Sequence, residues 1–195
     1  MAWARNGTPD TLSGTNATMT ITDLTSSKFN VFLSHMIDPS TNLSVNADFD
    51  NDTSTSYADR QSLSGAADTT ATSQTHFNQD ADTGNDDDRF TVWYWCNISG
   101  EEKLGIGFMV NRNTAGAANP PPRGEIVSKF DTTAGQFSEV DYDTSTGTMG
   151  IGSNLTALTG DETETVTLQD GTIFEETDTN KAYIWNSSTE TWTQL

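Results

Sequence analysis

The stretch Phe90-Thr-Val-Trp-Tyr-Trp-Cys-Asn-Ile98, the turn Ser99-Gly-Glu-Glu102 and the stretch Lys103-Leu-Gly-Ile-Gly-Phe-Met-Val110 together decide the fold class. Apolar side chains recur at every second position on both sides of the polar turn. This period of two is typical of an antiparallel hairpin, because successive side chains of a strand point to opposite faces. The chain is therefore built around a central β-hairpin.

Both faces of this hairpin are apolar. Trp93 and Trp95 share one face, and we expect Gly105 and Gly107 on the facing strand to make room for their indoles. The other face carries Phe90, Val92, Tyr94, Cys96, Ile98, Leu104, Ile106, Phe108 and Val110. Because one sandwich covers only one face of a sheet, we expect the second face to meet a further layer, a partner subunit or a ligand.

Other period-two stretches lie at 43–49, 124–130 and 136–142, at short intervals along the chain. Many short strands separated by turn residues predict an all-β protein, an antiparallel β-sandwich that is jelly-roll-like. One segment breaks the pattern. Phe29, Phe32, Leu33 and Met36 fall at i, i+3, i+4 and i+7, which predicts one short amphipathic helix over 25–37.

The last residues form a separate pattern. Strand-forming residues from Gly171 onward are interrupted by polar turns at 178–181 and 186–189, which predicts a small C-terminal β-meander. The polar connection before it places the domain boundary near Asp161. We therefore expect a β-sandwich core domain over 1–160 and a C-terminal module over 161–195.

The motif Phe174-Glu-Glu-Thr-Asp-Thr-Asn-Lys-Ala-Tyr-Ile-Trp185 resembles a terminus found in structural proteins of tailed phages and archaeal tailed viruses, of the capsid-accessory and tail-fibre types. In these proteins the segment reads F-x-E-T-D-T-x-K-x-Y-x-W. The resemblance covers the chain only from Gly171 to Leu195. It implies a virion building block.

Charge limits the partners that the chain can have. It contains 28 Asp and Glu against nine Lys and Arg, and its formal net charge is −19 at pH 7. Such a surface repels nucleic acid and anionic membranes, and it suits a saline environment that screens self-repulsion. The first residues lack the apolar run of a signal peptide, and Cys96 is the only cysteine. We therefore expect assembly in the host cytoplasm, without membrane insertion or an intrachain disulfide.

Signals for an enzyme are weak. His35 and His76 are the only histidines, and the sequence has no metalloprotease, hydrolase, phosphate-loop or dinucleotide motif. We therefore predict no catalytic residues and no organic cofactor.

One acidic loop could bind a metal. Asp80, Asp82 and Asp86 place oxygen atoms close together in a loop that contains Gly84, and Ca²⁺ requires six to eight oxygen ligands. The loop lacks the twelfth-position Glu of an EF-hand. A solvated acidic loop without calcium is the alternative.

Trp93 and Trp95 allow three interpretations: a buried second face of a central strand, a subunit interface, or a platform for stacking sugars. Tyr183, Trp185 and Trp192 allow the same alternatives. Our first hypothesis is a virion structural protein that forms homo-oligomers, a capsid, decoration or tail component of a marine or halophilic virus. The alternative is a receptor-binding fibre head that recognises host glycans. A hydrolase of surface polymers is a third hypothesis.

Overall fold

The computed structural model describes residues 3–39, 43–79, 88–112, 116–118, 120–160, 170–176, 181–186, 188–189 and 191–195. These residues form sixteen β-strands and no helix. The chain divides into two compact units, Met1–Glu162 and Thr163–Leu195. The sequence predicts this boundary near Asp161, close to where the structure divides.

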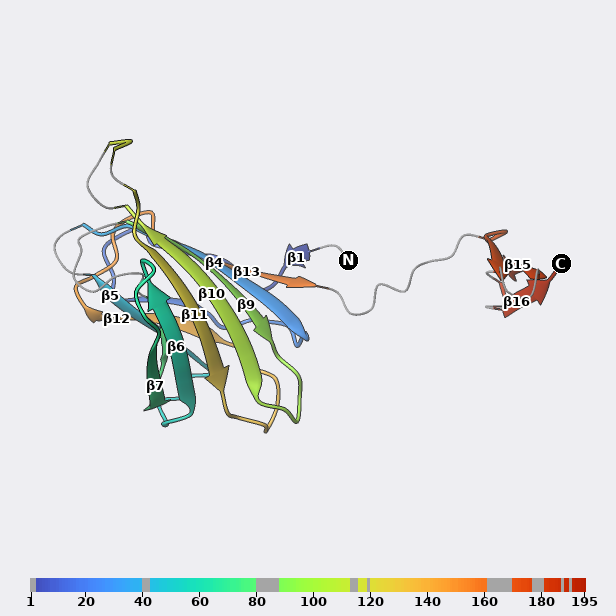
Figure 1. Cartoon of the computed structure of the whole chain (residues 1–195), viewed down its shortest axis with the longest axis horizontal. Helices are drawn as coiled ribbons and strands as arrows, with labels where there is room; N and C mark the ends of the chain where they lie inside the picture. Colours follow the sequence, from blue (N-terminus) through green and yellow to red (C-terminus); the bar gives the residue numbers. More distant parts are fainter. Residues whose placement is uncertain are drawn as a thin grey trace. The chain divides into compact units, whose positions relative to one another are not determined.

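The first unit contains two antiparallel sheets. The large sheet has nine strands, in the order β1-β13-β4-β9-β10-β11-β6-β7, with β2 paired to β13. Its strands are β1 (Trp3–Arg5), β2 (Asp10–Thr11), β4 (Phe29–Met36), β6 (Tyr57–Leu63), β7 (Thr69–Gln74), β9 (Arg89–Cys96), β10 (Lys103–Asn111), β11 (Arg123–Phe130) and β13 (Asn154–Gly160). Figure 1 shows β4, β9, β10, β11 and β6 side by side.

The small sheet has four strands in the order β3-β12-β5-β8. They are β3 (Thr18–Ile21), β5 (Ser44–Phe49), β8 (Phe77–Asn78) and β12 (Val140–Thr146). The buried apolar residues of the two sheets form one cluster. The predicted all-β antiparallel fold is thus confirmed, as an open, sandwich-like arrangement of two layers.

The predicted helix over 25–37 is wrong, because this segment forms strand β4. Phe32 and Met36 are buried in the core, whereas Phe29 and Leu33 lie on the opposite face and are half-buried. A spacing of four residues fits one face of a helix, but it is also two full periods of a strand. Since β4 lies inside the large sheet between β13 and β9, it carries apolar residues on both faces, and this imitates a helical stripe.

The core between the sheets is largely aromatic. The Phe49 ring of the small sheet stacks on Phe137 with 4.0 Å between centroids, and it meets the edge of Trp95 at 4.9 Å. Phe77 meets Trp93 and Trp95 at 5.0 Å each. Such pairs contribute about 0.5–1.5 kcal/mol each beyond the area they bury. The indoles of β9 therefore anchor the small sheet to the large one.

The glycines of β10 make room for the indoles, as the sequence predicted. Gly105 pairs with Trp95, and Gly107 pairs with Trp93. A Cβ atom built on either glycine would lie less than 3.0 Å from the indole of its partner. Each indole thus packs directly on the backbone of the neighbouring strand, a position that only glycine permits.

The second unit contains the predicted meander of three antiparallel strands, β14 (Ile173–Glu176), β15 (Lys181–Asn186) and β16 (Thr191–Gln194). Trp185 pairs with Trp192 across β15 and β16, and their ring centroids lie 5.3 Å apart.

Candidate functional site

The most unusual feature of the first unit is the face of the large sheet that points away from the core, here called the outer face. Along β10 every second residue is buried, and the residues between them are exposed. Exposed fractions of 42% to 58% are found for Trp3, Phe90, Tyr94, Leu104, Ile106, Phe108, Val110 and Val127. Exposed apolar patches of this breadth commonly mark an interaction site.

The strand register aligns these side chains in rows across the sheet. One row runs through Val31, Tyr94, Ile106 and Val127 on β4, β9, β10 and β11, and it ends at Arg60 on β6. The next row contains Leu33, Val92, Phe108 and Glu125 on the same four strands. Side chains opposite one another on one face are close enough to touch, so the rows merge into one apolar surface.

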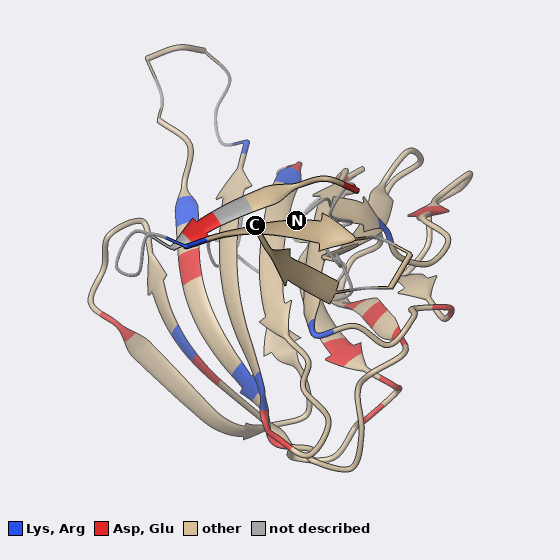
Figure 2. Ribbon diagram, turned by 90° about the vertical axis from the view of Figure 1, so that its right-hand side faces the viewer, with Lys and Arg blue, Asp and Glu red and all other residues tan. Residues whose placement is uncertain are grey.

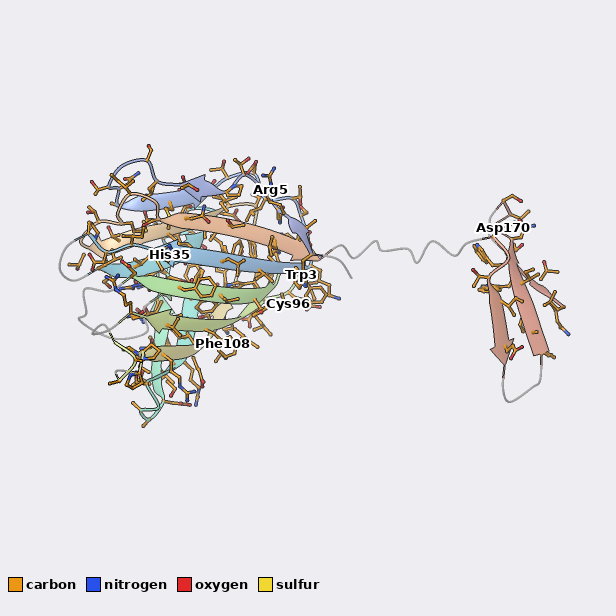
Figure 3. All side chains as sticks on the ribbon, turned by 90° about the horizontal axis from the view of Figure 1, so that it is seen from above. Trp3, Arg5, His35, Cys96, Phe108 and Asp170 are labelled. Atoms are coloured by element: carbon orange, nitrogen blue, oxygen red, sulfur yellow. The ribbon has the colours of Figure 1, made fainter. Side chains whose placement is uncertain are left out.

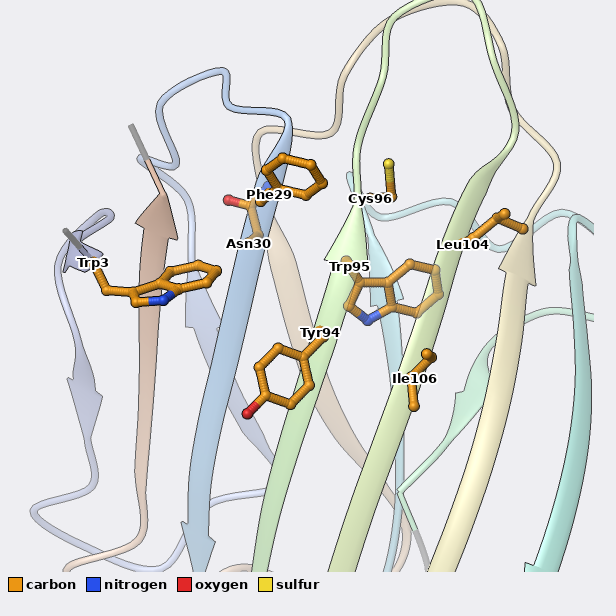
Figure 4. A pocket seen from close by; sticks show the side chains of 8 residues that line it. All are labelled: Trp3, Phe29, Asn30, Tyr94, Trp95, Cys96, Leu104 and Ile106. Carbon is orange, nitrogen blue, oxygen red and sulfur yellow. The ribbon is translucent and has the colours of Figure 1, made fainter. Parts of the chain in front are cut away.

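A hollow of about 500 Å³ opens at one end of the outer face. It is lined by Trp3, Phe29, Asn30, Tyr94, Trp95, Cys96, Leu104 and Ile106, which Figure 4 shows on neighbouring strands. The amide of Asn30 is already used: it accepts a hydrogen bond from Asn6 Nδ2 at 2.9 Å and donates one to the Ser27 carbonyl oxygen at 3.1 Å. The lining of the hollow is therefore mostly apolar.

Two smaller hollows continue along the same face. One of about 300 Å³ is lined by Phe90, Phe108 and Arg123 among others, and one of about 280 Å³ by Ile106, Phe108 and Arg60 among others. Figure 3 labels Trp3, His35, Cys96 and Phe108, which lie on β1, β4, β9 and β10. The surface of the outer face is thus uneven, with hollows between exposed aromatic rings such as those of Tyr94 and Phe108.

The charged residues of the outer face lie along its β11 and β6 side rather than in its middle. The middle stretches of β4, β9 and β10 carry no charged residue, and Figure 2 shows the positions of the charged residues in blue and red. On β11 Arg123 and Glu125 pair at 3.4 Å, and Lys129 pairs with Glu102 at 3.1 Å. These exposed pairs contribute little stability. They border an apolar surface that itself lacks charge.

The opposite outer surface, on the small sheet, is polar and acidic. Thr20 Oγ1 donates a 2.6 Å hydrogen bond to Asp141, which pairs across the strands with Asp48. Burial, followed by the negative charge of Asp141, raises the pKa of Asp48 to about 7. Burial also raises the pKa of Asp141, although the Thr20 hydroxyl opposes this shift. The two outer surfaces of the sandwich therefore differ sharply in character.

The structure describes all five aromatic residues that the sequence proposes as interface or glycan contacts, two in the first unit and three in the second. Trp93 and Trp95 are 0% and 2% exposed and lie in the core, so the outer face is formed by the alternate residues of the same strands. In the C-terminal meander Trp192 is 40% exposed, and Tyr183 and Trp185 are half-buried.

The proposed calcium ligands Asp80, Asp82 and Asp86 lie outside the described residues. Within the described part of the chain, no group of three or more His, Cys, Asp or Glu side chains is placed to hold a metal ion. That same part contains no helix long and apolar enough to cross a membrane.

The alternation in the sequence identifies the two faces of the hairpin but does not mark Ile106 and Phe108 as site residues. The available signal was the pair Gly105 and Gly107, which are too small to cover a surface and therefore mark the face that the indoles fill. Comparison with known proteins adds nothing to this assignment, since no family model, curated protein or solved structure matches the chain.

Proposed function

We propose that this protein is a virion structural subunit that assembles with copies of itself, as a capsid, decoration or tail component. The observation that carries the proposal is the broad apolar middle of the outer face on a subunit whose net charge is −19. An acidic chain that keeps large side chains such as Phe108 half exposed is suited to permanent association. The likeness of Phe174–Trp185 to the terminus of tailed-virus structural proteins supports the virion setting.

Two further features fit this proposal. The chain crosses repeatedly between the sheets, since β3, β5, β8 and β12 belong to the small sheet and β4, β6, β9 and β13 to the large one. Such crossing favours a jelly-roll-like sandwich, an architecture used by viral capsid proteins. The acidic surface suits a marine or halophilic virus, because salt screens the repulsion between neighbouring subunits.

The test is the mass and form of the purified full chain. Light scattering after gel filtration in molar NaCl should give a multiple of the 21.1 kDa chain, and electron microscopy should show closed or stacked particles. A chain that stays monomeric at every concentration and salt level contradicts the proposal. Portal, terminase or tail genes beside its gene would support the virion assignment independently.

Recognition of host glycans is the second candidate function. It is favoured by the paired rings of Trp185 and Trp192, the second of which is 40% exposed in the meander. Flat aromatic faces of this kind can stack on sugar rings. Binding on a glycan array that Trp192→Ala abolishes, without a change in oligomeric mass, would support this role.

A further inference from the structure

The outer face has the area of a complete protein interface. Its eight large apolar side chains are each about half exposed, and at roughly 100 Å² apiece they offer about 800 Å². This equals the share that each partner contributes to an interface of standard size, and it exceeds the largest apolar patch on a typical monomer. One partner of similar breadth would bury the whole surface.

Charge restricts which partner fits. Two chains of net charge −19 repel each other, so they can associate only where acids are scarce. Among the outward-pointing residues of β4, β9, β10 and β11, Glu125 is the only acid, and it pairs with Arg123. Arg60 and Lys129 stand at the same border, where they pair with Asp68 at 3.8 Å and Glu102 at 3.1 Å, so the border carries no excess of negative charge. The outer face is therefore the part of the sandwich on which copies can meet.

The relief of the face fits its own copy. The rows that cross the sheet follow one another along the strands. The row of Cys96 and Leu104 lies beside the large hollow, and the row of Phe90 and Val110 lies at the other end. A two-fold axis across the strands reverses this order between two facing sheets. The Phe90 and Phe108 end of one copy then lies over the hollow of the other, and Ile106 of each copy faces Phe108 of its partner.

We propose that two copies of this chain pack outer face to outer face, sheet on sheet, around a two-fold axis across the strands near the middle of β10. Facing sheets pack about 10 Å apart, which lets the side chains of the two faces interdigitate. This pair is the building unit of the assembly in the proposed function, on which the inference rests. It places Ile106 and Phe108 at the centre of the contact.

The test uses two charge variants of the full chain and a matched control. Ile106→Glu and Phe108→Lys change side chains that are each 50% exposed, and Ile151→Glu changes an apolar residue that is 64% exposed in a turn. Alone, each of the first two should raise the dimer Kd at least about 30-fold, because each places a charged side chain inside the apolar contact. Ile151→Glu should leave Kd within about twofold of the parent.

Mixing the two variants tests the axis itself. In a mixed pair, the carboxylate introduced by Ile106→Glu in one chain would face the ammonium group introduced by Phe108→Lys in the other. The second contact of the pair keeps the unchanged Ile106 against the unchanged Phe108. An equal mixture should therefore recover the mass of the pair in sedimentation, although each variant alone is monomeric. Circular dichroism of each variant checks the fold, and Tyr94→Glu on β9, which would face Val92 of the partner copy, replaces either variant in the single-variant test if that variant fails to fold.

The outcomes separate the two proposals. A parent that oligomerises while both variants keep its mass overturns the outer-face pair and leaves self-assembly standing. A parent that is monomeric in low and high salt overturns both. Mixing that fails to restore the pair overturns the two-fold arrangement. Binding of a monomeric parent to neutral phosphatidylcholine vesicles, lost in Ile106→Glu, would assign the face to a lipid surface instead and overturn the pair.

Discussion

Replacing Gly105 with alanine tests the contact on which the sandwich depends. A Cβ atom at this position would lie 2.5 Å from the indole of Trp95, far inside van der Waals contact. The indole has little room to move away, because the ring centroids of Phe49 and Phe77 lie 4.9 Å and 5.0 Å from its own centroid. The substitution should therefore strain the core rather than fill space.

The expected change in the free energy of unfolding combines two opposing effects. Overpacking a core costs about 1–3 kcal/mol. Replacing glycine with alanine also lowers the conformational entropy of the unfolded chain, which stabilises the folded state by about 0.4–1 kcal/mol. The free energy of unfolding should thus fall by about 1–2 kcal/mol, and Tm should fall by about 2–4 °C for each kcal/mol in a chain of this size.

Urea denaturation followed by circular dichroism is the appropriate assay, since guanidinium ions would screen the acidic surface. The control is Gly135→Ala, because a Cβ atom there meets no other atom within 4 Å. Its stability should stay level or rise slightly. Equal effects of Gly105→Ala and Gly135→Ala would refute the close contact.

A double-mutant cycle sharpens the test. Trp95→Phe removes Cζ2 and other outer atoms of the indole that a Cβ at Gly105 would strike, and Trp95 Nε1 has no hydrogen-bond partner among the described residues that the change would orphan. Gly105→Ala should therefore cost at least about 0.5 kcal/mol less in the Trp95→Phe background than in the parent. Strict additivity would show that the two residues do not press on each other.

Three further predictions concern solution conditions. The pKa of Asp48 is about 7 in the folded chain against a usual 3.8, so its charge penalises the folded state above that pH. Stability should therefore rise as the pH falls from about 8 to about 5, and Asp48→Asn should weaken this dependence; a Tm that falls over this range in the parent contradicts the argument. Tm should also rise from low to molar NaCl, because salt screens a net charge of −19, and a flat or falling trend would remove the argument for a saline environment. If Asp80, Asp82 and Asp86 bind calcium, a chelator should lower Tm in the parent but not in Asp82→Ala, whereas an unresponsive parent would favour the solvated loop.

The sequence alone determined the features that arise from neighbouring residues. Alternation in 90–98 and 104–110 specified two strands and a hairpin, because side chains of a strand project with a period of two. Gly105 and Gly107 predicted where the two indoles pack, since side chains of cross-strand neighbours occupy the same space. The C-terminal meander followed in the same way from its turn residues. Each of these features depends on residues close in the chain or directly paired.

The tertiary structure alone decided which apolar face is buried. Trp93 and Phe108 are both large and apolar, and Gly105 and Gly107 show only where the indoles pack on the neighbouring strand, not which face meets a second sheet. That choice depends on β5, β8 and β12, which reach the indole face through distant crossovers. The same reason explains the error at Phe29–Met36, where a strand flanked on both sides by β13 and β9 carries apolar residues on both faces. Period and composition describe one strand at a time, whereas burial is set by the layer that packs against it.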